Sequence, residues 1–224
     1  MKVGLIADIH ANLPALEAVF DDMPPVDDVV CAGDVVGYNP WPAACVDRVR
    51  ETASTTVQGN HDATVETPER YRANRMAAAG LEHARAELSE PQLAWLRTLP
   101  RTARFGDGRF LLVHSHPSPE RDGAYVYPES FPTLERYLDD AAGVVLGHTH
   151  VQAAEWIGDD RLVVNPGSVG QPRDGDPDAA YAVLDTDAER VDLRRVEYDR
   201  DRVRNAVEEA GLPSRTAERL YEGN

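Results

Sequence analysis

Short apolar runs that end in aspartate, asparagine or histidine constrain this chain more than any other feature of its sequence. Such polar clusters follow the runs at residues 3–7, 29–32, 53–58, 110–113 and 144–147. Because open α/β sheets place their sites outside the carboxyl ends of the strands, these clusters are expected to converge on one crevice. The chain is therefore predicted to build a polar site from several loops at one edge of a sheet.

Apolar runs alternate with helical patterns through the first third of the chain. Strands are predicted at residues 3–7, 28–32 and 53–58, and helices between them at 13–22 and 42–51. This spacing favours parallel βαβ units. The middle is predicted to be helical over residues 73–88, and Ser89 is the expected N-cap of a helix at 90–99.

The rest of the chain returns to strands. They are predicted at residues 109–114, 143–146, 155–157, 162–164, 180–185 and 191–198, followed by a polar helical tail at 199–224. No repeat, linker or low-complexity segment divides the sequence, so residues 1–224 are expected to form a single domain. The expected fold class is α/β with mixed sheets, either one mixed sheet or two packed sheets flanked by helices.

Composition narrows the class of protein. The 224 residues suffice for one α/β domain, and the sequence has no 18-residue apolar run that would span a membrane. The first residues lead straight into a strand, so we expect no signal peptide and a cytoplasmic location. Cys31 and Cys45 lie in apolar contexts and are expected to be buried free thiols, which suits a reducing compartment.

The charge of the chain is strongly negative. The formal net charge is −16, and Lys2 is the only lysine among the 23 basic residues. Because such a surface repels nucleic acid and anionic membranes, neither is expected as a partner. The acidity fits a well-solvated acidic protein or a halophilic one from a salt-rich cytoplasm, where screening weakens self-repulsion.

The polar clusters contain residue types that bind divalent metal ions. In extended backbone, residues two apart face the same way, so Asp8 with His10, and His148 with His150, are each expected to reach one ion. The candidate ligands are Asp8, His10, Asp34, Asn60, His114, His148 and His150. Carboxylates, imidazoles and an amide without thiolates suit Mn²⁺, Fe²⁺, Zn²⁺ or Ni²⁺. These ligands are too many for one tetrahedral site and enough for two ions that share a carboxylate and clamp a phosphoryl group.

Each cluster alone has a simpler interpretation. A single Asp-x-His or Gly-Asp at a strand end is more often a turn or a cap than a ligand. The clusters favour a metal site because all of them occur in this order, each after a strand. His83 is expected to be a surface residue of a helix, and His116 is either a supporting partner of the site or a loop residue.

In this order of motifs the chain resembles the calcineurin-like metallophosphoesterase superfamily. The motifs are Asp-x-His, Gly-Asp, Gly-Asn-His-Asp, His and Gly-His-x-His, and the match runs from Asp8 to about Gly170. The segment at residues 165–173 also resembles the closing loop of the small prokaryotic phosphodiesterase branch. The resemblance implies a four-layer αββα sandwich of two mixed β-sheets flanked by helices.

The resemblance also implies roles for the candidate residues. Asp8, His10 and His150 fall on a first metal ion, Asn60, His114 and His148 fall on a second, and Asp34 bridges the two. His61 is implied to be the catalytic residue and not a ligand. It would contact the phosphate or protonate the leaving oxygen, which suits an imidazole that titrates near neutral pH.

One motif departs from the phosphoprotein phosphatases of the superfamily. Their motif is Gly-Asp-x-x-Asp-Arg-Gly, in which the second aspartate orients the catalytic histidine and the arginine binds phosphate. Gly37 and Tyr38 occupy those positions here. Hydrolysis of phosphoserine is therefore disfavoured, and phosphate contacts are expected from backbone amides, Asn39 or Arg173.

The leading hypothesis is a phosphoesterase with two divalent ions that hydrolyses a small or nucleotide-like phosphodiester by in-line attack of a metal-bridging hydroxide. One alternative is a non-catalytic interaction module, because the retromer's phosphoesterase-like subunit resembles this fold without the full catalytic set. A phosphomonoesterase or phosphoprotein phosphatase is another alternative, and the charge disfavours a nuclease. The sequence leaves the oligomeric state open.

Overall fold

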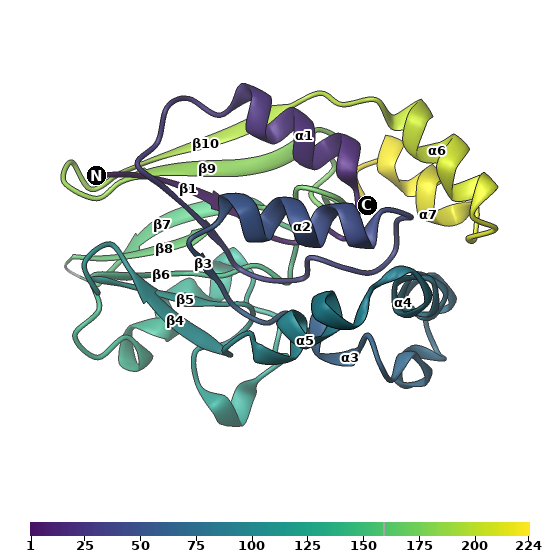
Figure 1. Ribbon diagram of the computed structural model, residues 1–224. Coiled ribbons are helices and arrows are strands. Elements are labelled where there is room, and N and C mark those ends of the chain that lie inside the picture. The colour runs from purple at the N-terminus through teal and green to yellow at the C-terminus, as the bar shows by residue number, and fades with distance from the viewer. Residues whose placement is uncertain (159) are drawn as a thin grey trace.

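Two five-stranded mixed sheets pack face to face in the computed structural model, which describes residues 1–158 and 160–224 (Figure 1). In order across the first sheet, the strands are β10 (Arg190–Val196), β9 (Ala179–Asp185), β1 (Lys2–Ile6), β2 (Asp28–Cys31) and β3 (Thr55–Thr56). In order across the second, they are β4 (Thr102–Phe105), β5 (Phe110–Val113), β6 (Gly143–Val145), β8 (Arg161–Asn165) and β7 (Ala153–Ile157).

Each sheet contains three adjacent parallel strands. In the first sheet β1 pairs with β2, and β2 with β3, in parallel, whereas β9 pairs antiparallel with β1 and β10. In the second sheet β5, β6 and β8 are parallel, and β4 and β7 are antiparallel edges. The carboxyl ends of the parallel strands therefore carry the loops that follow them.

Helices flank both sheets. The α-helices are α1 (Leu13–Asp22), α2 (Pro42–Thr52), α3 (Asn60–Thr64), α4 (Arg75–Glu87), α5 (Glu90–Thr98), α6 (Arg200–Glu209) and α7 (Arg215–Glu218). The 3₁₀ segments are η1 (Pro68–Tyr71), η2 (Pro119–Arg121), η3 (Pro128–Tyr137) and η4 (Arg219–Tyr221). In Figure 1, α3 to α5 and the C-terminal α6 and α7 lie together at one end of the sandwich.

Alternating side chains of the strands build separate apolar layers. Leu5 of β1 packs between the sheets, whereas the next residue, Ile6, faces the layer of helices that includes α1 and α2. In β6, Val144 faces Phe131 of η3 and Val145 faces the other sheet. Because successive strand residues point to opposite faces, each sheet is buried on both sides. The predicted four-layer sandwich is confirmed, with the 3₁₀ segment η3 covering the second sheet.

Several elements differ from the prediction. The third strand contains only two residues, because beyond it Gln58 donates its N–H to Pro100 instead of to the sheet. Strand β4 and segment η3 were not predicted, since β4 is an edge strand with an exposed, charged pattern and η3 contains an internal proline. The helix after Ser89 is confirmed, with Ser89 and Gln92 forming a capping box.

The C-terminal segment packs against the rest of the protein. Val203 and Val207 of α6, and Leu220 of η4, are buried in the same apolar layer as α1 and α2. Cys31 and Cys45 are free and buried, as expected. In the described residues, no helix has the length and apolar character needed to cross a bilayer.

Candidate metal centre

The polar clusters meet at one edge of the sandwich. They follow β1, β2 and β3 of the first sheet and β5 and β6 of the second, each at its carboxyl end. Because the two sheets pack face to face, loops from both contribute side chains to the same site. The prediction that these clusters converge is confirmed.

The extended backbone assumed for the pairs Asp8–His10 and His148–His150 is wrong. Asp8, His10, His148 and His150 all have left-handed backbone, with φ of 52°, 49°, 68° and 59°. Left-handed non-glycine residues cost on the order of 1 kcal/mol each and cluster at functional sites. Backbone hydrogen bonds between loops hold this conformation: Asp8 N–H donates to Gly33 O at 2.9 Å, and His10 N–H to Asp34 O at 3.0 Å.

The first group of candidate ligands contains Asp8, His10 and His150. The Nε2 atoms of the two imidazoles are 3.1 Å apart, and Asp8 Oδ1 lies 3.3 Å from His150 Nε2 and 3.9 Å from His10 Nε2. His10 Nδ1 lies 3.1 Å from Val36 O, and His150 Nδ1 lies 2.6 Å from Gln171 O. Since a carbonyl oxygen only accepts, both Nδ1 atoms carry the proton and both Nε2 atoms present lone pairs.

Asp34 lies between two groups of ligands. Its Oδ2 is 3.7 Å from His10 Nε2 and 3.4 Å from His114 Nε2. Its Oδ1 accepts the backbone N–H of His61 at 2.8 Å, which fixes the orientation of the carboxylate. One carboxylate oxygen therefore faces an imidazole on either side.

The second group contains Asn60, His114 and His148. Asn60 Oδ1 lies 2.9 Å from His114 Nε2, and His114 Nδ1 lies 2.8 Å from Ala32 O. The Nε2 of His148 donates to Gly123 O at 3.1 Å, which leaves its Nδ1 unprotonated in the neutral ring. The backbone N–H of His148 also donates to Asp8 Oδ2 at 2.9 Å, so the two groups share a hydrogen bond.

Burial favours the neutral form of three of the candidate imidazoles and of the Asp8 carboxyl, whose pKa it raises to about 7. Burial lowers the pKa of His10 and of His150 well below the usual range, and lowers that of His148 to about 4. Burial also opposes protonation of His114, yet the Asp34 carboxylate raises its pKa to about 10. In the absence of a metal ion, the negative charge of Asp34 therefore keeps His114 protonated at neutral pH.

Burial lowers the pKa of His61 to about 4, although it was expected to titrate near neutral pH. The imidazole is therefore neutral at pH 7 unless a bound anion changes its surroundings.

The donor set fits divalent cations. Asp8 Oδ1 is buried without a hydrogen-bond partner in the part of the chain that the structure describes, and it faces two imidazole lone pairs. Asp8 with His10 and His150, and Asp8 with Asp34 and His114, each bring their ligand atoms within 4.8 Å of one another. Acceptor atoms that face one another in a buried site repel unless a cation lies between them. Oxygen and nitrogen donors without thiolate suit first-row divalent ions.

Asp62 supports the site in a way that the sequence analysis missed. Its carboxylate accepts backbone N–H groups from Gly59, Asp34, Val35 and Val36, at 2.9 to 3.2 Å. It thereby ties the loop that carries Asp34 to the start of α3, which carries Asn60 and His61. Residues 59–62 do not form a plain turn, because Gly59 is the N-cap of α3 and residues 60–62 form its first turn.

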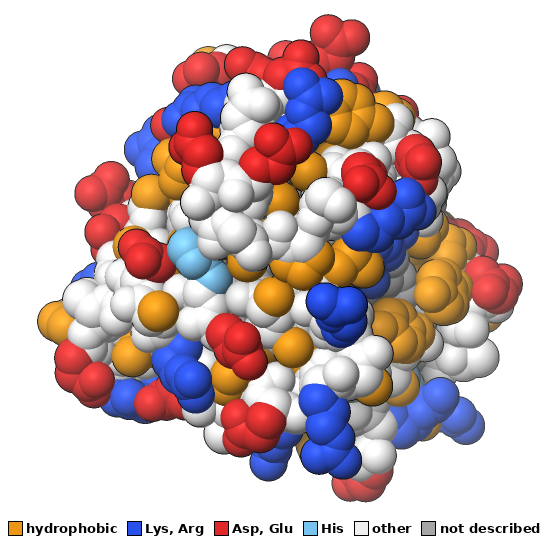
Figure 2. Space-filling model, turned by 90° about the vertical axis from the view of Figure 1, so that its right-hand side faces the viewer, with side chains coloured by type: hydrophobic (Ala, Val, Ile, Leu, Met, Phe, Trp, Pro, Cys, Tyr) orange, Lys and Arg blue, Asp and Glu red, His pale blue; other side chains and the backbone are white. Residues whose placement is uncertain are grey.

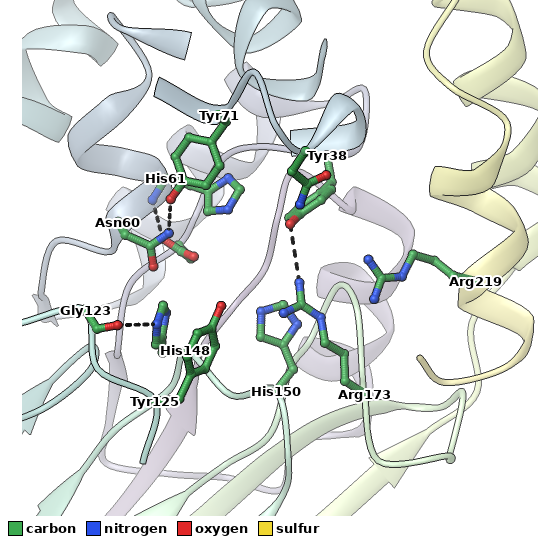
Figure 3. A pocket seen from close by; sticks show the side chains of 12 residues that line it. Tyr38, Asn60, His61, Tyr71, Gly123, Tyr125, His148, His150, Arg173 and Arg219 are labelled. Atoms are coloured by element: carbon green, nitrogen blue, oxygen red, sulfur yellow. Dashed lines mark hydrogen bonds between the residues drawn. The ribbon is translucent and has the colours of Figure 1, made fainter. Parts of the chain in front are cut away.

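A cavity of about 480 Å³ opens over these residues (Figure 3). Its lining includes Asp34, Asn60, His61, His148 and His150 together with Tyr38, Tyr71, Asn74, Gly123, Tyr125, Arg173 and Arg219. Of the latter set, only Arg173 was predicted to contact substrate. Tyr71, Tyr125 and Arg219 come from segments distant in sequence and carried no recognisable motif.

Asn39 does not take the expected place. Its side chain is fully buried, and its Nδ2 donates to His10 O at 2.9 Å behind the site. The prediction that Asn39 contacts phosphate is therefore wrong, because its side chain instead holds the loop that carries His10.

The other two histidines lie elsewhere. His116 is buried and its Nδ1 accepts the Ser118 N–H at 3.0 Å, whereas His83 is half-buried with its Nε2 3.2 Å from Pro40 O. Neither histidine lines the cavity.

Figure 2 shows the end of the sandwich on which α6 and α7 lie. Acidic and basic side chains are interspersed over this face, and the basic ones do not gather into a stripe. This distribution gives no track for a nucleic-acid backbone on the side displayed.

Comparisons with known proteins agree with the geometry. Residues 1–189 match the model of the calcineurin-like phosphoesterase superfamily domain. The uncharacterized protein MJ0912 of Methanocaldococcus jannaschii is 30% identical, over 99% of this chain and 98% of its own. A crystal structure of a metallophosphoesterase from Sphaerobacter thermophilus is 35% identical with a TM-score of 0.86, over the whole of both chains.

A more distant structure, that of the hypothetical protein PH1004 from Pyrococcus horikoshii, has the same fold. It is 20% identical with a TM-score of 0.84, over 100% of this chain and 98% of its own. The arrangement of the candidate ligands and the two packed sheets are consistent with the family that these matches indicate. The chain belongs to the calcineurin-like phosphoesterase superfamily.

Proposed function

We propose that the protein is a metal-dependent phosphoesterase that hydrolyses a small or nucleotide-like phosphodiester. The observation that carries the proposal is the position of Asp34, whose Oδ2 faces both His10 and His114 at the floor of a cavity of about 480 Å³. Two divalent ions bound there would activate a water and offset the charge of a phosphoryl group. Mn²⁺, Fe²⁺, Zn²⁺ and Ni²⁺ all suit this donor set.

The proposed ligands divide around Asp34. Asp8, His10 and His150 would hold one ion, and Asn60, His114 and His148 the other, with Asp34 shared. The hydrogen bonds from Nδ1 of His10 and His150 to backbone carbonyls support ligation through Nε2. His148 uses its Nε2 to bond Gly123 O, which supports ligation through its Nδ1.

His61 is proposed as the catalytic residue. It lines the cavity, and its backbone N–H holds the carboxylate of Asp34 at 2.8 Å. The ring packs edge-on against His10 and at a tilt against Tyr38 and Tyr71, with centroids 4.8 to 4.9 Å apart, so these neighbours restrict its orientation. From this position it would donate a hydrogen bond to a phosphoryl oxygen or a proton to the leaving oxygen.

Tyr38 favours a diester over a phosphoprotein substrate. It stands where the phosphoprotein phosphatases carry an arginine, it is 3% exposed, and its ring packs edge-on against His10. A monoester near neutral pH carries two charges and gains from an arginine beside the metals, whereas a diester carries one. Arg173 approaches Tyr38 from another loop, with Nη2 3.4 Å from the hydroxyl, and would contact the outer part of a substrate.

Turnover of model substrates tests the function. Metal-reconstituted protein is expected to hydrolyse bis-p-nitrophenyl phosphate with kcat/KM at least comparable to that for p-nitrophenyl phosphate, at the same metal and salt. Chelation should abolish both activities, and His10→Ala should do the same without unfolding the protein. Absence of metal-dependent turnover of either ester would favour the non-catalytic interaction module.

A further inference from the structure

Two arginines lie side by side on the wall of the cavity away from Asn60 and His148. Arg173 belongs to the loop between β8 and β9, and Arg219 begins η4 near the C-terminus. Both line the cavity, and in Figure 3 the guanidinium group of Arg219 points toward Arg173. Arg219 lies outside residues 1–189, which match the family model.

The hydrogen-bond partners of these two side chains are not aspartate or glutamate side chains. Arg173 donates to Gln171 Oε1 at 2.7 Å and approaches the Tyr38 hydroxyl, and Arg219 Nε donates to the backbone oxygen of Asn224. Within residues 1–158 and 160–224, neither forms an ion pair with an aspartate or glutamate side chain. Arg215, four residues before Arg219, instead pairs with both Glu218 and Glu222.

The two cations are held together against their repulsion. Burial and the charge of Arg173 lower the pKa of Arg219 to about 10, which still leaves it protonated at neutral pH. In a chain with 39 acidic residues, two adjacent arginines without acidic side-chain partners are an arrangement that an anion would relieve.

The fold fixes both arginines relative to the candidate metal centre. The backbone N–H of Arg173 donates to His150 O at 3.1 Å, so its loop is tied to a proposed ligand. Arg219 lies between the buried Ala217 and Leu220, which anchor this segment in the apolar layer. Gly175 N–H donates to Gly223 O at 2.9 Å and links the two segments.

We propose that Arg173 and Arg219 form a second anion subsite, which binds a further phosphate group of the substrate while its scissile phosphodiester lies at the metal centre. The inference rests on the proposed function only for the position of the phosphodiester bond that is cleaved. Arginine binds phosphate oxygens in a bidentate manner, and a cavity of about 480 Å³ accommodates more than one phosphate group. Arg219 would then be a specificity-determining residue contributed by the C-terminal segment.

A matched pair of chromogenic diesters tests this subsite. The substrates are the p-nitrophenyl ester of thymidine 5′-phosphate and the same ester with a second phosphate on the 3′ oxygen, so the scissile bond is unchanged. The wild type is expected to favour the 3′-phosphorylated ester in kcat/KM by about tenfold or more. Arg219→Gln should remove most of that preference while leaving kcat/KM for the simple ester within about threefold, and Arg219→Lys should keep part of it.

Arg215→Gln is the matched control, because it removes the same charge from the same segment outside the cavity. It should retain the wild-type preference. In a second measurement, titration calorimetry on metal-free protein should give tighter binding of thymidine 3′,5′-bisphosphate than of thymidine 5′-monophosphate, and Arg219→Gln should abolish the difference.

Equal kcat/KM values for the two esters in the wild type, or an unchanged preference in folded Arg219→Gln, would overturn the subsite. So would equal affinities of the two nucleotides in calorimetry. A wild type that hydrolyses neither ester but still binds the bisphosphate more tightly through Arg219 would instead contradict the proposed function and support the subsite.

Discussion

Gly37 lies so close to the ring of His61 that a side chain at position 37 would displace that ring. A Cβ added to Gly37 would lie 2.5 Å from His61 Nδ1, and the backbone of Gly37 is left-handed with φ of +98°. This glycine stands where the phosphoprotein phosphatases place an aspartate beside the catalytic histidine. The orientation of His61 therefore depends on the close approach of Gly37 and on packing against its aromatic neighbours.

Gly37→Ala is expected to displace the His61 ring and lower kcat by about 10²-fold, because small misplacements of a catalytic group are costly. Gly108→Ala is the control: Gly108 also has positive φ, at +80°, but a Cβ there meets no atom within 4 Å. Both variants share the backbone strain, and only Gly37→Ala clashes with His61. Comparable kcat values for the two variants would show that the contact does not position the ring.

His61→Ala is expected to lower kcat by about 10²–10⁴ while the metal content stays near the wild-type value. His148→Ala should lose metal as well as rate. Elemental analysis of the two purified variants, beside their kinetics, measures both effects. A metal-depleted His61→Ala protein would mean that His61 is a ligand.

The two proposed roles of His61 can be separated with leaving groups of different basicity. If the ring protonates the leaving oxygen, the loss in His61→Ala should grow from p-nitrophenyl to phenyl esters, because phenol leaves less readily without a proton. If it contacts only the non-bridging phosphoryl oxygens, the loss should be similar for both.

The net charge of −16 yields a prediction about salt. At about 1 M salt the screening length falls to about 3 Å, so repulsion among exposed carboxylates should weaken and the melting temperature should rise by about 5 °C or more. Melting curves in KCl from low to molar concentration measure this. A melting temperature that does not change with KCl concentration would show that repulsion among the acidic side chains does not limit the stability of the fold.

The sequence was sufficient to predict that the candidate ligands lie close together, because each lies within a few residues of a recognisable strand end. It was not sufficient for their geometry: the pairs Asp8–His10 and His148–His150 were assigned to extended backbone, whereas all four residues are left-handed. Such conformations are imposed by hydrogen bonds between loops, for example Asp8 to Gly33, which local sequence does not encode.

The outer part of the cavity was harder to predict. Arg219 reaches it only because Ala217 and Leu220 pack into the apolar layer, and no motif marks a contact between residues so far apart. Asn39 shows the converse error. A polar residue beside the metal-binding motif was expected to face substrate, but backbone groups behind the site also need partners, and Asn39 satisfies the carbonyl of His10.

Asp34→Asn tests the shared carboxylate on which the proposed centre depends. The substitution preserves size but removes a negative charge that would act on both cations, so metal content should fall from about two ions per chain to less than one. Asp47→Asn, an exposed aspartate on α2, makes the same charge change and should bind metal like the wild type. Elemental analysis after reconstitution with Mn²⁺ gives the stoichiometry. A wild-type protein that binds clearly less than one ion, or an Asp34→Asn variant that still binds two, would contradict a centre bridged by Asp34.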